Sequence, residues 1–220
     1  EPMPYLEWIH GRPEAATHDL GSSDLQTERT DGAVVPPPLR GLAHPEDPPS
    51  LERSIAAEYD VDESEVLVTA GATHANFLAA ATTLSLAEGG EVLVERPGYD
   101  PLVHTPAGVG GAVARFDRPA ETGYALLPER VRGAVTDETA MVTVTNRHNP
   151  TGKLTSRSAL AEIAAVAVDE DTYLLVDEVY GPYTDDDAGG AFGGVTAAGL
   201  PNTVATGSFT KFHGLGDLQI

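Results

Sequence analysis

The chain has 220 residues, contains no cysteine, and carries 34 acidic against 13 basic side chains, for a formal net charge of −21. The missing cysteines exclude disulfides, thiolate metal sites and thiol nucleophiles. The negative charge argues against a nucleic-acid partner, because Lys and Arg supply most of the affinity for phosphate backbones. Apolar residues make up 41 % of the chain, which predicts a packed domain. We interpret the acidity as adaptation to a salt-rich cytoplasm, where ions screen like-charge repulsion.

The first part of the chain predicts little regular structure. Residues 1–49 are rich in Pro, Gly and acidic residues, so we expect an extended N-terminal arm. The start lacks the layout of a signal peptide, and no apolar run approaches the ~20 residues of a membrane span. These features predict a cytoplasmic location.

From residue 50 onward, the pattern is that of one large domain covering 50–220. Ser50 is expected to cap a short helix in SLERSIAAEY. Runs rich in β-branched residues then alternate with Ala-rich helical stretches. The predicted strands are 66–69, 91–97, 111–117, 140–146, 173–180 and 202–208, and the predicted helices between them are 72–87, 99–109, 128–135 and 156–170.

This alternation predicts an α/β fold, a three-layer αβα sandwich around a mainly parallel sheet. The segment 184–199 is expected to be a flexible, solvated loop. No Gly-rich nucleotide-binding pattern follows a predicted strand, which argues against a nucleotide-binding domain. Metal catalysis is also disfavoured, because the seven histidines show no ligand spacing.

Polar residues follow the predicted strands at the edge where ligands bind in parallel sheets. Ala72 and Thr73 enter a helix after the first strand, a position suited to holding a phosphate. Tyr99 follows the second strand and offers a ring for stacking. Asn149 stands before a Pro-Thr-Gly turn and offers a side-chain amide.

The later strands bring an acid and an amine to the same edge. Asp177 lies in a β-rich run with Tyr180 three residues later, and Ser208 is followed three residues later by Lys211. Each residue alone has a simpler explanation, such as a helix cap, a core ring, a turn or a structural acid. Together they supply a phosphate cradle, a stacking ring, hydrogen-bond donors, an acid and an amine.

Lysine is nearly absent from this chain, whose two lysines are Lys153 and Lys211. Arginine supplies surface charge but cannot form an imine, whereas a desolvated lysine can lose its proton and do so. We therefore interpret Lys211, beside a strand end, as the reactive amine. Lys153, just after a turn, is expected to be a surface residue.

Three motifs in this order resemble those of class I/II aminotransferases, which are fold-type I pyridoxal-phosphate enzymes. They are HNPTG around Asn149, Asp-x-x-Tyr in DEVY, and Ser-x-x-Lys in SFTK, with weaker support from GATH and ERPGYDP. The resemblance runs from about Ser50 to Ile220. It implies pyridoxal 5'-phosphate as cofactor and a homodimer with sites at a two-fold interface.

The resemblance implies specific roles for the matching catalytic residues. Lys211 would form a Schiff base with the cofactor and later move a proton between the substrate α-carbon and cofactor carbon C4′. Asp177 would keep the pyridine nitrogen protonated, which makes the ring an electron sink. Asn149 and Tyr180 would hydrogen-bond the phenolic oxygen, and Asn149 would also lie near the substrate.

The remaining roles concern binding. By the same resemblance, Tyr99 would stack on the cofactor ring, and Ala72, Thr73 and Ser208 would hold its phosphate. Gly21 would match an N-terminal glycine near the substrate.

The sequence departs from the family pattern in three places. Gln219 stands where the family usually has a phosphate-binding arginine, eight residues after the lysine. The aromatic residue that a partner subunit offers to the phosphate has no clear match, although His44 lies nearby. The family's C-terminal small domain, with its arginine for the substrate carboxylate, is absent, so we expect a large domain that is incomplete at its C-terminal end.

The leading functional prediction is amino transfer between an amino acid and a 2-oxo acid. The same cofactor residues also serve β-lyases and decarboxylases, so these remain alternatives. A non-catalytic ligand-binding module of the same fold is the third reading, favoured by Gln219.

Overall fold

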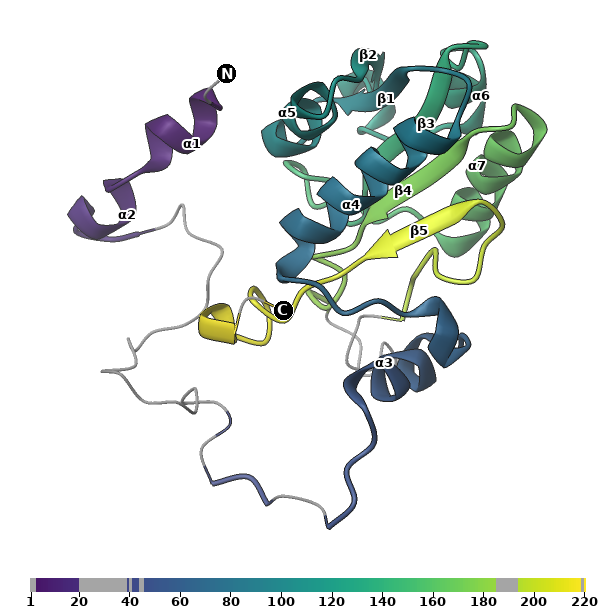
Figure 1. Ribbon diagram of the computed structural model, residues 1–220. Helices are drawn as coiled ribbons and strands as arrows, with labels where there is room; N and C mark the ends of the chain where they lie inside the picture. The colour runs from purple at the N-terminus through teal and green to yellow at the C-terminus, as the bar shows by residue number, and fades with distance from the viewer. Residues whose placement is uncertain (1–2, 20–38, 40, 44–45, 185–193, 219) are drawn as a thin grey trace.

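The computed structural model describes residues 3–19, 39, 41–43, 46–184, 194–218 and 220, and within them it confirms the predicted fold class. The strands form one parallel sheet in the order β2-β1-β3-β4-β5 (Figure 1). Their bounds are β1 Glu91–Arg96, β2 Ala112–Asp117, β3 Thr139–Thr145, β4 Tyr173–Asp177 and β5 Thr203–Thr206.

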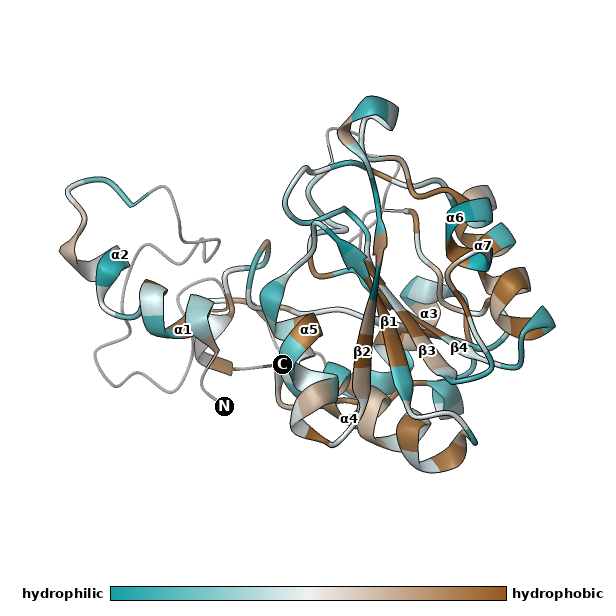
Figure 2. Cartoon of the chain, turned by 90° about the horizontal axis from the view of Figure 1, so that it is seen from above, coloured by the Kyte–Doolittle hydropathy of each residue, from teal (hydrophilic) through white to brown (hydrophobic). Residues whose placement is uncertain are grey.

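Helices cover both faces of this sheet, as a three-layer sandwich requires (Figure 2). On one face lie α4 and α5, and on the other lie α6 and α7. Their bounds are α4 Gly71–Leu86, α5 Asp100–Gly108, α6 Pro128–Arg132 and α7 Arg157–Asp169. Single-turn 3-10 helices span Glu63–Glu65 (η2), Ala120–Thr122 (η3) and Gly216–Leu218 (η5).

The core forms because side chains alternate between the two faces of each strand. In β1, Leu93 packs with the α7 residue Ile163, whereas Val92 and Val94 pack beneath α4 and α5. All of these side chains are buried. Burial on both faces explains why the central strands are continuous apolar runs.

Serine caps begin two of the helices. The Ser50 hydroxyl accepts a hydrogen bond from the backbone amide of Arg53 and so begins α3 (Leu51–Tyr59), as predicted. The Ser156 hydroxyl accepts from the Ala159 amide at the start of α7.

The strand predicted at 66–69 is wrong. This segment forms no ladder with any described residue, and Leu67 is 74 % exposed. Its apolar, β-branched composition favours a strand, but a strand also needs a neighbour to pair its backbone groups. The strand predicted at 173–180 ends earlier, at Asp177. The Asp177 side chain there accepts a hydrogen bond from the backbone amide of Val179.

The N-terminal arm contains more helix than its composition predicts. Helices α1 (Pro4–Ile9) and α2 (Arg12–Ala15) lie within it. In both, a proline occupies the first turn, where a missing backbone N–H costs nothing, so proline here starts a helix.

The segment predicted as a solvated loop is only partly described, since 185–193 lie outside the described residues. After them, Ala197 is fully buried in the core next to α7. Its amide donates to the Glu178 carboxylate at 2.7 Å, and the Arg157 guanidinium donates to the Thr196 carbonyl. The expectation of a solvated loop is therefore wrong for this end of the segment.

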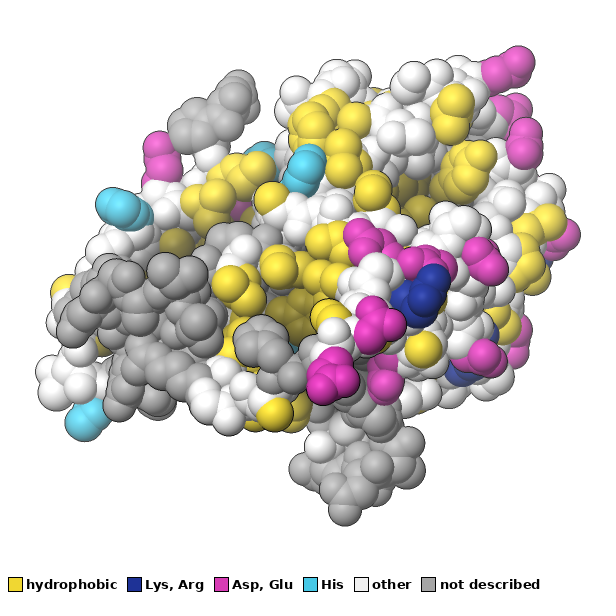
Figure 3. Space-filling view, turned by 60° about the horizontal axis from the view of Figure 1, so that its bottom comes forward, with side chains coloured by type: hydrophobic (Ala, Val, Ile, Leu, Met, Phe, Trp, Pro, Cys, Tyr) yellow, Lys and Arg dark blue, Asp and Glu magenta, His cyan; other side chains and the backbone are white. Residues whose placement is uncertain are grey.

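The described surface is acidic. On the face shown in Figure 3, Asp and Glu side chains are more prominent than Lys and Arg. Among the described residues, no helix combines the length and apolar character needed to cross a membrane.

Candidate active site

The carboxyl ends of β3, β4 and β5 lie side by side, held by hydrogen bonds between the loops that follow them. The Asn146 amide donates to the Asp177 carbonyl at 2.9 Å, and the Glu178 amide donates to the Thr206 carbonyl at 2.7 Å. These contacts bring the predicted acid, the phenol of Tyr180 and the segment leading to Lys211 to one edge of the sheet.

Asp177 is buried at the end of β4 and accepts hydrogen bonds from neutral donors. Its Oδ1 accepts from the Val179 amide at 3.1 Å, and its Oδ2 accepts from the Asn76 side chain of α4 at 2.9 Å. Burial raises the pKa of Asp177, while these two bonds and the charge of Lys211 oppose the rise. Within the described residues, the carboxylate has no ion-pair partner.

Lys211 is half-buried in the turn after β5. It lies close enough to Asp177 for its charge to lower the pKa of that carboxyl group. Its side-chain nitrogen makes no hydrogen bond or ion pair with the part of the chain that the structure describes. Lys153, in contrast, is exposed, as expected.

Tyr99 and Tyr180 are both half-buried and lie near this pair. Burial raises the pKa of Tyr99 to about 12, with smaller contributions from Tyr180, Tyr5 and Asp177. The Tyr5 ring of α1 meets the Tyr99 ring edge-on, with centroids 6.3 Å apart. The N-terminal arm therefore reaches the predicted stacking residue.

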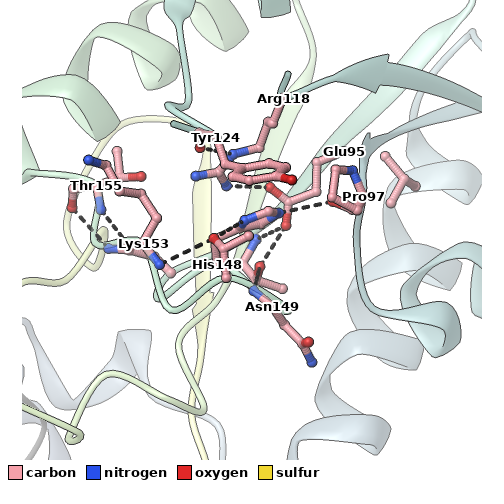
Figure 4. Close-up of polar contacts among 12 residues, drawn as sticks. Glu95, Pro97, Arg118, Tyr124, His148, Asn149, Lys153 and Thr155 are labelled. Atoms are coloured by element: carbon pink, nitrogen blue, oxygen red, sulfur yellow. Dashed lines mark hydrogen bonds and ion pairs between the residues drawn. The ribbon is translucent and has the colours of Figure 1, made fainter. Parts of the chain in front are cut away.

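Asn149 is held by a chain of buried polar contacts (Figure 4). Its backbone amide donates to the Thr145 hydroxyl at 2.9 Å, and that hydroxyl donates to Glu95 Oε1 at 2.6 Å. The other Glu95 oxygen accepts from the Arg118 guanidinium at 2.6 Å, and both side chains of this ion pair are at most 1 % exposed. A buried ion pair thus fixes the backbone of the Asn149 turn.

His148 braces the same turn from its other side. Its Nε2 lies 2.9 Å from the Pro97 carbonyl, and its Nδ1 lies 2.7 Å from the Thr151 hydroxyl. Burial lowers the pKa of His148, which favours the neutral ring. Because a carbonyl only accepts, Nε2 carries the proton and Nδ1 accepts from Thr151.

The start of α4 offers backbone donors beside this edge. Its N-cap residue, Ala70, makes no side-chain cap, and Gly71 adopts a left-handed φ of 75°. The amides of Ala72 and Thr73 lie in the first turn of this 16-residue helix, and helix N-termini attract anions. Ser208 is buried, but its hydroxyl donates to the Ile220 carbonyl at 3.0 Å and lies 2.8 Å from the Thr210 hydroxyl.

Three residues considered in the sequence, Gly21, His44 and Gln219, lie outside the described residues. Sequence reasoning also missed residues that the fold brings to the site. Asn76 and Thr206 contact the Asp177 network, and Glu95 supports Asn149. The sequence does carry a signal for two of them: Asn76 is a side-chain amide in an Ala-rich helix, and Glu95 is an acid inside an apolar strand.

The site fits pyridoxal phosphate chemically. A buried carboxylate that forms no ion pair with a described residue suits a protonated ring nitrogen, and a half-buried amine without hydrogen bonds to described residues suits an aldehyde. The uncapped start of α4 suits a phosphate.

Comparison with known proteins identifies the family. The model for aminotransferase class I and II matches residues 37–218. A probable N-succinyldiaminopimelate aminotransferase from Mycobacterium tuberculosis is 40 % identical over 59 % of this chain and 34 % of its own length. A histidinol-phosphate aminotransferase from Sphingopyxis alaskensis is 30 % identical over 93 % of this chain and 54 % of its own.

A solved structure shows the same fold. It is a PLP-dependent aminotransferase from Streptococcus suis, with a TM-score of 0.63 and 27 % identity, covering 76 % of this chain and 43 % of that one. The chain thus spans about half the length, or less, of the proteins it matches. The expected cofactor class is confirmed at the level of the family. This chain belongs to the aminotransferase class I and II family.

Proposed function

We propose that this chain forms the cofactor-binding part of an aminotransferase that moves an amino group between an amino acid and a 2-oxo acid. The observation that carries the proposal is a half-buried Lys211 beside the buried Asp177 carboxylate. When bound, pyridoxal phosphate supplies an electron sink for the pair of electrons left on the substrate α-carbon. In this reading, residues 50–220 are the cofactor-binding domain and residues 1–49 the arm.

Lys211 has two tasks in this proposal. Its amine would be the group that holds the cofactor through the cofactor aldehyde. The same amine would also hold and move the proton that passes between the substrate α-carbon and cofactor carbon C4′. The position of Lys211 supports both tasks, because its half-buried side chain lies near Asp177 at the carboxyl edge of the sheet.

Asp177 would keep the ring nitrogen protonated. A buried carboxylate is costly without a cation, so a pyridinium proton between the two groups stabilises both charges. Asn149 and Tyr180 would donate to the phenolic oxygen, and Tyr99 would cover the ring face. Asn149 would also lie near the substrate.

The phosphate would be held by Ala72, Thr73 and Ser208. Support comes from the helix N-terminus, whose backbone amides and dipole attract an anion. With Gln219 at the family's arginine position, these neutral donors would hold the phosphate without that arginine. Gly21 would lie near the substrate.

An absorption titration with pyridoxal phosphate tests the proposal. Wild type and the matched Lys153→Ala variant should both develop the band of a lysine-bound cofactor, and Lys211→Ala should not, since it lacks the amine. A band of full intensity in Lys211→Ala would overturn the assignment.

The reaction class is tested on the loaded chain with added amino acids. Amino transfer leaves pyridoxamine phosphate, whereas β-lyase or decarboxylase chemistry releases an eliminated group or carbon dioxide. Gln219, in place of a phosphate-binding arginine, favours a non-catalytic ligand-binding module as the second candidate. That candidate predicts cofactor binding without any turnover.

The oligomeric state and the cellular environment of the chain are also proposals. We propose a homodimer working in a salt-rich cytoplasm, supported by the family membership and by the net charge of −21. Unfolding measured against KCl concentration tests the second part. Stability should rise with salt as repulsion is screened, and a flat response would contradict it.

A further inference from the structure

Asn76 links two elements behind the proposed site. It lies on α4, is 6 % exposed, and contacts polar groups at the ends of β4 and β5. The Thr206 hydroxyl donates to its Oδ1 at 2.8 Å, and its Nδ2 donates to Asp177 Oδ2 at 2.9 Å. The proposed function so far gives Asn76 and Thr206 no role.

The direction of these hydrogen bonds is fixed by chemistry. An ionised carboxylate only accepts, so the amide NH₂ must face Asp177. The amide oxygen then faces Thr206, where it needs a donor, and the hydroxyl supplies one. This arrangement favours ionised Asp177, because the Asn76 amide and the Val179 amide both donate to the carboxylate, and such bonds are stronger to the charged form.

The network also orients the carboxylate. From the described residues, each oxygen of Asp177 accepts one hydrogen bond, one from the Val179 amide just after its own strand and one from α4. A carboxylate has about four acceptor positions, so two remain for a further donor. Both existing donors are neutral, so neither balances the negative charge.

We propose that Asn76, anchored by Thr206, is a positioning residue that holds Asp177 ionised and aimed at the ring nitrogen of the cofactor. The inference rests on the proposed function and deepens it. Asn76 acts through Asp177 and contacts neither the reacting atoms nor the cofactor.

The first test uses the chain without cofactor. NMR titration of ¹³C-labelled Asp carboxyl groups follows Asp177, whose signal is identified by its loss in Asp177→Asn. Asn76→Leu, which keeps the size but removes the donor, should raise the pKa of Asp177, because a bond that favours the charged form is lost. Thr206→Val should shift it in the same direction by less.

The second test uses the loaded chain with ¹⁵N-labelled pyridoxal phosphate. In wild type, the ring-nitrogen shift should be that of a protonated pyridine. Asn76→Leu should move it toward the unprotonated value, and conversion of added amino acid should slow about 10- to 100-fold, the effect of losing one hydrogen bond to a charged group. Thr206→Val should move the ring-nitrogen shift in the same direction. Thr206→Ser, which keeps the hydroxyl, should bring it most of the way back to the wild-type value.

Thr83→Val is the matched control, because it also changes a buried polar residue of α4. It should leave both NMR signals in place. If Asn76→Leu fails to fold, the Asp177 titration and the ring-nitrogen shift of Thr206→Val test the proposal in its place.

The outcomes separate the two proposals. Unchanged Asp177 titration and unchanged ring-nitrogen shift in the variants, with the cofactor still bound to Lys211, would overturn the role of Asn76 and leave the proposed function standing. Failure of wild type to bind the cofactor, with Asp177 still shifted in Asn76→Leu, would refute the proposed function and reduce Asn76 to a structural partner of the acid, which also overturns its positioning role.

Discussion

Glu95 and Asp177 are both buried acids near the carboxyl edge of the sheet, but their partners differ. Glu95 pairs with the Arg118 guanidinium at 2.6 Å and accepts two further hydrogen bonds from Thr145. Among the described residues, Asp177 accepts hydrogen bonds only from the neutral donors Asn76 and Val179, and Lys211 acts on it through its charge. The first acid has its countercharge within the chain. The second is suited to a cationic group brought by a ligand.

Removing the charge of Glu95 should have the largest effect on stability. Glu95→Gln leaves Arg118 buried and unpaired, which should lower the free energy of unfolding by about 3–5 kcal/mol. Urea denaturation measures the change. Asp117→Asn is the control, since it breaks the exposed ion pair between Arg96 and Asp117 in the same region of the sheet and should have a much smaller effect. Equal losses of unfolding free energy in Glu95→Gln and Asp117→Asn would contradict the contrast between the buried and the exposed ion pair.

Removing the charge of Asp177 should affect chemistry while sparing stability. Asp177→Asn should still bind the cofactor through Lys211, but amino transfer should slow about 100- to 1,000-fold, the usual loss for one preorganised electrostatic group. Its free energy of unfolding without cofactor should not fall, because an uncompensated buried charge is removed. Full activity in this variant would disprove the role of the acid.

Glu178, next to Asp177 in the chain, is a third buried acid, and its protonation makes the stability of the fold depend on pH. The pKa of Glu178 is raised from 4.5 to about 7, mainly by burial and to a smaller extent by Asp177, although hydrogen bonds from Thr196 and the Ala197 amide and the charge of Arg157 oppose the rise. The half-buried Tyr59 lies close enough to Glu178 to be affected by its charge. The folded chain therefore binds a proton more tightly than the unfolded chain, and stability falls as pH rises from about 4.5 to 7.

Glu178→Gln should remove that fall, which amounts to about 3 kcal/mol for this single group. Urea unfolding at a series of pH values measures it. An identical pH slope in wild type and Glu178→Gln would show that the group does not titrate as described.

The smallest expected loss of stability comes from removing an exposed polar contact. Ser156→Ala removes the cap of α7 and should cost about 1 kcal/mol of unfolding free energy. Thermal unfolding checks it, and a loss as large as that of Glu95→Gln would blur the distinction between buried and exposed partners.

The sequence predicts those parts of the molecule that depend on local pattern. Alternating strands and helices were sufficient for the fold, and strand-end position was sufficient to select Asp177 and Lys211 as candidates. The segment 66–69 was misjudged because composition does not say whether a strand has a neighbour.

The supporting contacts could not be predicted, since they join residues far apart in the chain. Asn76 and Asp177 are 101 positions apart, and Thr206 is 130 positions from Asn76. Arg118 meets Glu95 only because β1 and β2 are neighbours in the sheet. Such pairings follow from topology, which local patterns specify only in outline.

The most direct test is to find where the cofactor bonds. Borohydride reduction of the loaded chain converts its carbon–nitrogen double bond into a stable single bond, and peptide mass spectrometry then locates the pyridoxyl group among the chain's two lysines and its amino terminus. We expect the label on Lys211. A label confined to Lys153 or to the amino terminus would contradict it.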